Sequence, residues 1–350
     1  MAVSARRDPE ADHQTMKYTN LGRTGVTVSR ICLGCMSYGD PKWRPWVLDE
    51  EASMPFFRMA VESGINFFDT ADMYSLGISE ELTGKALREL ANLEECVIAT
   101  KVFYPLTDGP NMRGLSRKHI QQGCETSLKR LGVEAIDLYQ LHRFDPHTPI
   151  DETLAALDLL VRQGKVRYLG SSSTTAWRFA QSLAASERNG WARFESMQNH
   201  YNLIYREEER EMIPLCQSEQ IAVIPWSPLA RGVLAGTRTA PDDKTSTLRA
   251  ESDDFARKLY DHPGDKAVMD AVIHLARQRG VEPAQIALAW MLSKQGVTAP
   301  IIGATKLPHL QAAIAAVDLE LSDEEVESLE APYQPHEMRG FLNFPARPGE

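Results

Sequence analysis

Residues 65–87, INFFDTADMYSLGISEELTGKAL, contain the structural unit that the chain repeats. The stretch opens as a short apolar run, becomes polar at Asp69 and Tyr74, and continues as an amphipathic helical pattern. A strand followed by a covering helix is typical of a parallel sheet. The carboxylate and phenol that follow the strand also suggest function, because a turn requires only residues such as Gly, Asn or Pro.

The same order of apolar run, polar turn and helical pattern recurs along the chain. In the helical patterns, apolar residues recur three and four positions apart, and Asp or Ser stands at the expected N-caps. Eight runs are expected to be strands: 29–36, 65–71, 96–102, 136–143, 166–173, 194–202, 221–230 and 299–305. An open doubly wound sheet would usually carry a G-x-G-x-x-G loop after its first strand, and this chain has none. We therefore predict an α/β fold, a closed (β/α)8 TIM barrel.

The ends of the chain and one interruption complete the predicted organisation. Residues 1–15 lack the apolar core of a secretory signal and are expected to be a disordered leader. Residues 16–335 are expected to form one barrel domain that begins with a β-hairpin, and residues 336–350 a C-terminal tail. The segment from about 231 to 264 is rich in Gly, Thr, Asp and Pro, and predicts a long functional loop after the seventh strand.

Composition excludes several classes of protein. The formal net charge of −10 argues against nucleic-acid and anionic-membrane partners, which prefer a basic surface. No apolar run reaches the roughly 18 residues that a membrane-spanning helix needs. Strand pleating would send the C-x-x-C pair Cys32 and Cys35 to opposite faces. With only three other cysteines (Cys96, Cys124 and Cys216), we expect buried reduced thiols in a cytoplasmic protein.

Four polar residues fall at the ends of successive strands, where TIM barrels carry their chemistry. Asp69 ends the second strand, Tyr74 lies in the loop after it, and Lys101 and His142 end the third and fourth strands. A phenol has a pKa of about 10, and a neighbouring ammonium favours its ionised form. Lys101 would supply that charge, Asp69 would keep Lys101 protonated, and His142 would orient a substrate oxygen. This set can donate a proton to a carbonyl oxygen as a hydride reaches the carbon.

Each of these residues also has a structural interpretation when it is taken alone. Asp69 suits a turn or an N-cap, Tyr74 suits a rim aromatic, and His142 suits a hydrogen-bonded core histidine. Lys101 is harder to explain in this way, because charged groups are almost never buried unpaired. The occurrence of all four at successive strand ends favours a catalytic site.

The chain resembles the aldo-keto reductase superfamily over nearly its whole ordered length, from MKYTNLGRTGVTVSRICLG to LELSDEEVESLE. The segments that carry the resemblance are NFFDTADMYSLGISEELTGKAL, IATKV and IDLYQLHRFDP. It implies that Tyr74 is the general acid, assisted by Lys101, Asp69 and His142. The segments IPWSPLARGVLAG and IIGATKLPHL further resemble the bacterial branch that includes the β-subunits of voltage-gated potassium channels.

The resemblance also implies NADP (NADPH) as cofactor, held without a glycine-rich loop. Trp226 would stack on the nicotinamide, and cationic Lys306 near a 2′-phosphate favours NADP over NAD. Relatives often hold the adenine with Glu and Asn, where this chain has Ala312 and Ala313. This difference predicts weaker binding of the adenine. The residues implied to contact the cofactor are Cys35, Met36, Asp69, Ser172, Ser173, Gln198, Trp226, Ser227, Leu229, Arg231, Arg249, Gly303, Thr305, Lys306 and His309.

The predicted function is the NADP-dependent reduction of an aldehyde or ketone to the alcohol. The alternative is an NADPH-sensing regulatory subunit with weak reductase activity. A Schiff-base aldolase would use Lys101 as a nucleophile. A metal-dependent hydrolase would need clustered histidines, but His142, His147 and His200 are far apart in the chain, so no metal site is expected.

The expected partner is a small-molecule carbonyl substrate, and a homo-oligomer is compatible with the sequence. Arg143 suits either an anionic aldehyde or a surface ion pair. An apolar substrate pocket and plain loop packing are both compatible with Met36, Tyr38, Trp43, Trp46, Phe103 and Phe144.

Overall fold

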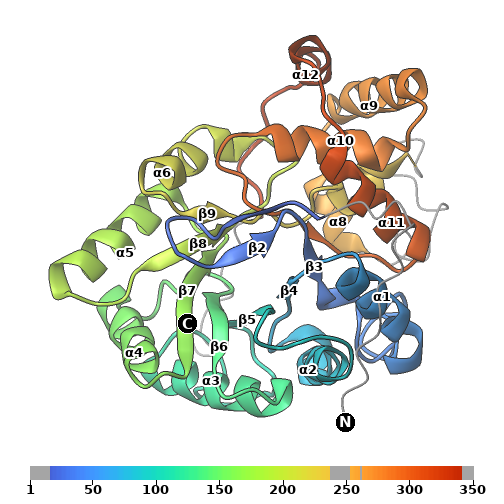
Figure 1. The fold of residues 1–350 in the computed structure, drawn as a ribbon. Coiled ribbons are helices and arrows are strands. Elements are labelled where there is room, and N and C mark those ends of the chain that lie inside the picture. The colour runs from blue at the N-terminus through green and yellow to red at the C-terminus, as the bar shows by residue number, and fades with distance from the viewer. Residues whose placement is uncertain (1–15, 237–252, 261, 341–350) are drawn as a thin grey trace.

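A computed structural model describes residues 16–236, 253–260 and 262–340 of the chain, and its eight-stranded parallel sheet forms the centre of the molecule (Figure 1). Neighbouring strands follow the order β10-β3-β4-β5-β6-β7-β8-β9, and every pair is parallel. The strands are β3 (Cys32–Gly34), β4 (Phe67–Asp69), β5 (Val97–Val102), β6 (Ile136–Leu141), β7 (Val166–Ser172), β8 (Phe194–Gln198), β9 (Ala222–Val223) and β10 (Ile301–Ile302).

The sheet closes on itself between its two shortest strands. Val223 pairs with Val297 in a parallel bridge, and the Thr298 amide donates to the Val223 carbonyl at 2.8 Å. The Ile301 amide donates to the carbonyl of Pro225 at 2.9 Å. These bonds join β9 to the chain that leads into β10, so the predicted (β/α)8 barrel is confirmed.

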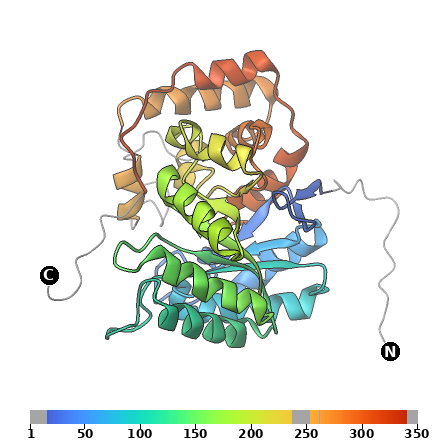
Figure 2. The ribbon, with the colours of Figure 1, turned by 90° about the vertical axis from the view of Figure 1, so that its left-hand side faces the viewer.

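Helices surround the barrel, as Figures 1 and 2 show. Each of the first six barrel strands is followed by one α-helix, and the later helices lie in the longer connections after β9 and β10. Side-chain caps fix several helix starts: Asp49 accepts from the Ala52 amide at 3.0 Å, and Ser116 from the His119 amide at 3.3 Å. The helices are α1 (Glu50–Glu62), α2 (Ile78–Leu90), α3 (Arg117–Leu131), α4 (Ile150–Arg162), α5 (Ala176–Asn189), α6 (Met212–Ser218), α8 (Asp254–Leu259), α9 (Asp265–Arg279), α10 (Pro283–Ser293), α11 (Leu307–Ala315) and α12 (Asp323–Glu330).

The predicted N-terminal hairpin is present and packs against the interior of the barrel. Its strands β1 (Tyr18–Asn20) and β2 (Thr27–Ser29) pair antiparallel. Leu21 and Val28 from the hairpin share one buried apolar cluster with inward-facing residues of the strands. Gly22 has φ +58°, and a Cβ there would lie 2.8 Å from the backbone nitrogen of Ala222. The hairpin therefore covers the end of the barrel at which the strands begin.

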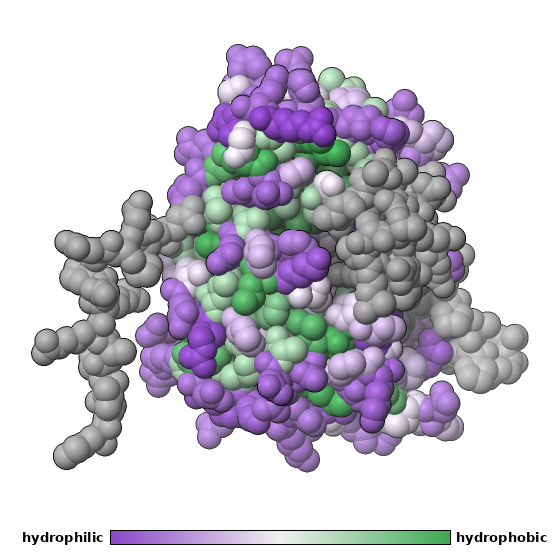
Figure 3. All heavy atoms as spheres, turned by 90° about the vertical axis from the view of Figure 1, so that its right-hand side faces the viewer, coloured by the Kyte–Doolittle hydropathy of each residue, from purple (hydrophilic) through white to green (hydrophobic). Residues whose placement is uncertain are grey.

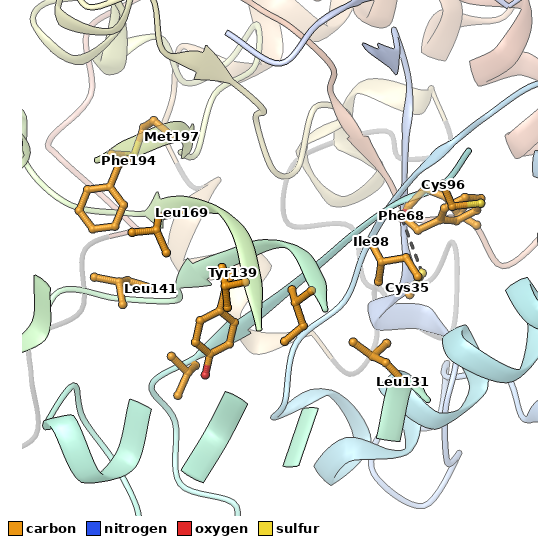
Figure 4. Close-up of a cluster of buried hydrophobic side chains, with 14 of the residues drawn as sticks. Cys35, Phe68, Cys96, Ile98, Leu131, Tyr139, Leu141, Leu169, Phe194 and Met197 are labelled. Carbon is orange, nitrogen blue, oxygen red and sulfur yellow. Dashed lines mark hydrogen bonds between the residues drawn. The ribbon is translucent and has the colours of Figure 1, made fainter. Parts of the chain in front are cut away.

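A second and larger core fills the space between the strands and the outer helices. Figure 4 shows part of it, with Phe68, Ile98, Tyr139 and Leu169 contributed by four neighbouring strands. Tyr139 satisfies its buried hydroxyl by donating to the Ile120 carbonyl at 3.2 Å. All five cysteines are buried and free, as expected. Burial raises the pKa of Cys35 to about 12, so this thiol is unreactive at neutral pH.

The remaining predictions on organisation have mixed outcomes. The long segment after β9 contains the 3-10 helix η4 (Ala230–Ala235) and α8, while residues 237–252 lie outside the described residues. The leader and the domain limits stay predictions.

In the described ranges, no helix has the length and apolar character needed to span a membrane. Polar residues predominate at the top and bottom of the face in Figure 3, and apolar residues gather between them.

Candidate active site

The four predicted catalytic residues meet at the end of the barrel at which the strands finish. Lys101 is fully buried on β5, and its ammonium donates to Asp69 Oδ1 at 2.5 Å and to the Thr70 carbonyl at 2.8 Å. The hydroxyl of Tyr74 lies 3.4 Å from Lys101 Nζ. The three side chains thus form one hydrogen-bonded group, as the sequence predicts.

Two carboxamides complete the surroundings of Asp69. Its Oδ2 accepts from Gln140 Nε2 and from Gln198 Nε2, each at 2.9 Å. Gln140 lies beside Lys101 in the register of β5 and β6. On the other side its neighbour is Gly170, where a Cβ would lie 2.8 Å from Gln140 Cγ. The absence of a side chain at Gly170 therefore leaves the room that Gln140 occupies.

The environment of Lys101 fixes its charge. Burial by itself lowers the pKa of Lys101, but the Asp69 carboxylate and the Tyr74 hydroxyl outweigh this effect, and the pKa is raised. All three ammonium protons are engaged, and the amine does not reach the cavity wall. A Schiff-base reaction needs a free neutral amine, so this geometry argues against the aldolase alternative.

A strained turn holds Tyr74. The residue begins the 3-10 helix η2 (Tyr74–Gly77), in which Ser75 and Leu76 adopt left-handed backbone conformations with φ of 48° and 54°. The Ser75 hydroxyl accepts from the Asp40 amide at 3.2 Å, which ties this turn to the loop after β3. Non-glycine residues in this region cost of order 1–3 kcal/mol and cluster at functional sites.

His142 lies next to the phenol. Its ring meets the rings of Tyr74 and Tyr104 edge-on, with centroid distances of 5.8 and 5.0 Å. Burial, Arg143 and Lys101 hold the pKa of His142 well below its usual range, so the imidazole is neutral at physiological pH. Its Nδ1 is buried without a hydrogen-bond partner. A neutral imidazole offers one N–H donor, which suits a carbonyl oxygen.

A cavity of about 990 Å³ opens beside these residues. Three predicted residues do not line it: Lys101 and Cys35, which are fully buried, and Ser173. Arg249 lies outside the described residues. The predicted residues that do line it are Met36, Asp69, Tyr74, His142, Ser172, Gln198, Trp226, Ser227, Leu229, Arg231, Gly303, Thr305, Lys306 and His309.

An aromatic stack supports Trp226 at the cavity wall. The indole lies on the ring of His200 at a centroid distance of 4.3 Å, and His200 lies on Tyr205 at 4.2 Å. Trp226 Nε1 donates to Ser173 Oγ at 3.1 Å. Ser173 therefore orients the indole. Gln198 uses its amide protons on Asp69 and Gln140, so only its Oε1 is left for a ligand.

Cationic and polar side chains line the cavity where α11 begins, in contrast to the aromatic wall at Trp226. Lys306 precedes this helix, is exposed, and lines the cavity with Thr305 and His309. The amides of a helix N-terminus and a lysine suit phosphate. Arg231 also lines the cavity but forms an ion pair with Asp253, which compensates part of its charge. A cavity with an aromatic platform at one part and cations at another fits a nicotinamide dinucleotide.

Some of the candidate substrate residues line the cavity and others do not. Met36, Trp43 and Trp46 line the cavity, and so does Tyr104, which sequence reasoning missed. Tyr38, Phe103 and Phe144 do not line the cavity. The expected surface ion pair of Arg143 is wrong, because Arg143 is 9% exposed and belongs to the cavity wall.

Sequence reasoning also missed two buried polar groups. Gln140 is two residues before His142, which directly follows β6, and strand periodicity over the run 136–143 could have placed both on the inner face. Glu208, in the 3-10 helix η3 (Glu207–Glu209), accepts a hydrogen bond from Asn199. Burial raises the pKa of Glu208 to about 8, with Asn199 opposing this and Glu207 adding to it.

One group of possible metal donors is present among the described residues, away from the cavity wall. It contains His262, Asp265 and His336, whose candidate donor atoms all lie within 4.8 Å of one another. His336 Nε2 lies 2.9 Å from Asp265 Oδ1, and both side chains are buried. This pair fixes the chain after α12 against the start of α9.

Comparisons with known proteins agree with this geometry. The profile of the Aldo/keto reductase family matches residues 30–334. Versiconal hemiacetal acetate reductase of Aspergillus parasiticus is 43% identical over 342 residues, which cover 91% of this chain and 98% of the relative.

Two further fungal proteins are similar over almost their whole length. A candidate aryl-alcohol dehydrogenase of Schizosaccharomyces pombe is 43% identical over 93% of this chain and 98% of its own. An aldo-keto reductase of Alternaria alternata is 42% identical over 92% of this chain and 93% of its own. None of these three relatives is named as a potassium-channel subunit, so the narrower resemblance to that branch gains no support.

Proposed function

The chain belongs to the aldo/keto reductase family, and we propose that it is an NADPH-dependent enzyme that reduces an aldehyde or ketone to the alcohol. The observation that carries the proposal is the contact of the buried Lys101 ammonium with Asp69 at 2.5 Å and with the Tyr74 hydroxyl at 3.4 Å. This contact lies beside a cavity of about 990 Å³, large enough for a ligand.

The chain's own residues provide the proton. Tyr74 Oη gives its proton to the carbonyl oxygen of the substrate, and the neighbouring ammonium stabilises the negative charge left on the phenol. Asp69 keeps that ammonium charged and in place, while Gln140 and Gln198 hold Asp69. His142, neutral because burial lowers its pKa, donates a hydrogen bond that orients the same carbonyl.

A reduced nicotinamide dinucleotide supplies the hydride when it is bound. In the proposal, Trp226 provides the platform for its ring, and Ser172 with Gln198 Oε1 lies near the carboxamide. Lys306 and the N-terminus of α11 hold its phosphates, and the lysine favours a 2′-phosphate. Support comes from the placement of all these groups on the wall of one cavity.

An aromatic carbonyl compound is the proposed substrate class. Trp43, Trp46 and Tyr104 provide flat apolar surface within the cavity wall. One relative is named as a candidate aryl-alcohol dehydrogenase, which agrees with this choice. We also propose a cytoplasmic location, because all five cysteines are free thiols.

The test is NADPH oxidation with a panel of benzaldehydes, ketones and sugar aldehydes, for the purified chain and its Tyr74→Phe variant. The variant should bind NADPH, read by Trp fluorescence, within about threefold of the parent. Its reduction rate should fall about 10²–10⁴-fold, the usual contribution of a general acid. Retained turnover in Tyr74→Phe would remove Tyr74 as the acid.

A further inference from the structure

We infer that the cavity contains a subsite for an anionic substituent of the substrate, formed by Arg143 beside the catalytic His142. The preferred substrates are then aromatic aldehydes or ketones that carry a carboxylate or a similar acidic group. The inference rests on the proposed function, since it assigns a substrate class to the same cavity.

Arg143 is a buried charge that forms no ion pair with the described residues. A guanidinium carries a positive charge and five N–H donors, and the residue is only 9% exposed on the cavity wall. Nη1 donates to the backbone carbonyl of His142 at 2.6 Å, and the buried Nε has no hydrogen-bond partner. None of the ion pairs within the described ranges includes Arg143.

Lys101 is paired with Asp69, and Arg231, which lines the cavity, is paired with Asp253. Two further cations line the cavity, but Arg44 is half-buried over the ring of Trp43 and Lys306 is exposed, so neither is as deeply buried as Arg143. Burying a charge without a partner is strongly unfavourable, and buried charges are therefore paired or bound to a ligand. Because Arg143 faces a cavity that accepts a ligand, we assign the missing partner to that ligand.

The position of Arg143 indicates the substrate as the source of the anion. Arg143 directly follows His142, whose ring lies 5.8 Å from the ring of Tyr74. Its guanidinium carbon lies 5.8 Å from the centre of the Tyr104 ring, which also lines the cavity. It therefore lies with the residues that handle the carbonyl oxygen. The cations suited to cofactor phosphates, Lys306 and Arg231, belong to the loops after β10 and β9.

The local charge balance also favours an acidic group. Asp69, the carboxylate of this part of the cavity wall, is already engaged by one ammonium and two carboxamides. His142 is neutral. A planar carboxylate matches the fork of a guanidinium with two parallel hydrogen bonds. Hydrogen bonds to charged groups are worth about 1.5–3 kcal/mol, which corresponds to roughly a 10- to 150-fold preference.

The experiment compares 4-carboxybenzaldehyde with its uncharged methyl ester, and the 3-carboxy isomer with its ester. The parent chain should favour the acids. The ratio of kcat/KM for acid over ester should fall about 10- to 100-fold in Arg143→Met and largely recover in Arg143→Lys. The kcat/KM ratio of acid over ester in the parent is then divided by the same ratio in the variant. This division cancels the difference in intrinsic reactivity between acid and ester.

Arg178→Met is the matched control. Arg178 lies over the rings of Phe144 and Trp177, at 4.2 and 5.0 Å, and does not line the cavity. Its acid-to-ester ratio should equal that of the parent. If Arg178→Met lowers the ratio as much as Arg143→Met does, general loss of positive charge explains the effect and the inference is overturned.

A binding measurement tests the subsite without turnover. With NADPH present, benzoate should raise the thermal midpoint of the parent chain, and benzamide should do so much less. Arg143→Met should lose the benzoate effect. Equal effects of benzoate and benzamide on the parent would overturn the inference, and this arm needs no substituted protein that must fold.

The remaining outcomes separate this inference from the proposed function. If the parent reduces acids and esters with ratios that Arg143→Met leaves unchanged, the subsite is wrong and the reductase stands. If Arg143→Met weakens NADPH binding by tenfold or more at an unchanged ratio, Arg143 binds a cofactor phosphate and the subsite is again wrong. If no carbonyl compound is reduced, the proposed function fails, and benzoate binding alone decides on the anion subsite.

Discussion

Asp69 and Glu208 are both buried carboxyl groups next to the cavity residues, but their partners differ. Asp69, at the end of β4, accepts from the Lys101 ammonium and from two carboxamides. Glu208, in η3 after β8, accepts from the Asn199 side-chain amide, and the like charge of Glu207 adds to the rise of its pKa. One site is built to hold an ion pair, and the other holds a carboxyl group that keeps its proton at neutral pH.

The strands of the barrel also differ in length from one side to the other. Strands β5, β6 and β7 have six or seven residues and carry or surround the ion pair. Strands β9 and β10 have two residues each, and Trp226 and Lys306, both proposed to bind the cofactor, lie in the connections after them. The comparison indicates that Lys101 and Asp69 are held by strands, whereas Tyr74 and the groups proposed to bind phosphate depend on the connections between strands and helices.

The largest expected effect comes from breaking the ion pair. Lys101→Met leaves the Asp69 carboxylate buried without its cation, and the free energy of unfolding should fall by about 3–5 kcal/mol. Reduction of aldehydes should also become undetectable. Urea unfolding of the purified variant measures the loss of stability.

The double variant Asp69→Asn, Lys101→Met serves as the control for that prediction. It removes both charges, so it should regain part of the lost stability while staying inactive. A cost below about 1 kcal/mol for Lys101→Met alone would show that the pair is not buried from water as described.

Glu208→Gln tests the opposite kind of carboxyl group. Because the pKa of Glu208 is raised to about 8 by burial, its contribution to stability is full below its ordinary pKa of about 4.5 and is lost as the pH rises towards 8. The Gln variant lacks this loss, so its advantage over the parent should grow between pH 5 and 8, by on the order of 2–4 kcal/mol. Urea unfolding at four pH values measures it.

The neighbouring Glu207 provides a control of opposite sign. Burial acts to raise its pKa, but hydrogen bonds from Tyr333, the His336 amide and Arg210 outweigh burial and lower it. Glu207→Gln should therefore lose stability relative to the parent as the pH rises above the folded pKa. A similar pH profile for both variants would contradict the assignment of Glu208.

On the loop side, Lys306→Ala should change affinity and leave folding intact. The exposed lysine is proposed to contact the 2′-phosphate, so the Kd for NADPH should rise about tenfold and that for NADH should stay within about twofold. Fluorescence titration measures both, with Lys42→Ala, an exposed lysine of another loop, as control. Equal losses for the two cofactors would mean that Lys306 does not discriminate between them.

The smallest expected effect is that of Ser173→Ala. It removes the acceptor for Trp226 Nε1, a neutral hydrogen bond worth about 0.5–1.5 kcal/mol. The KM for NADPH should rise two- to fivefold and the Trp emission should shift, whereas kcat should stay within about twofold. A large loss of kcat with unchanged emission would assign Ser173 a direct catalytic contact instead.

The sequence is informative wherever periodicity and charge agree. Eight apolar runs predict the eight strands, and Lys101 within VIATKV predicts a buried partner, which is Asp69. Strand limits are less well predicted, since the runs 29–36 and 65–71 become strands of only three residues. The run 221–230 becomes a strand of two residues, because Pro225 and Pro228 have no N–H to donate to a neighbour.

Side-chain networks across strands could not be predicted from local patterns. The contact between Gln140 and Asp69 joins residues 71 positions apart, and that between Gln198 and Asp69 joins residues 129 apart. For Arg143 the sequence is compatible with both an anionic substrate and a surface ion pair, because arginine side chains are mostly exposed. The fold turns it inward onto the cavity wall, which local sequence does not indicate.

The two-residue strands β9 and β10 also have a dynamic consequence. Few ladder bonds join the ends of the sheet there, so this seam should open more readily than the rest of the barrel and exchange its amide hydrogens first. The loops that follow the two strands are those proposed to grip the dinucleotide. A bound cofactor would then bridge the weakest junction of the barrel, and slower amide hydrogen exchange at Thr298 and Ile301 would show that it is bound.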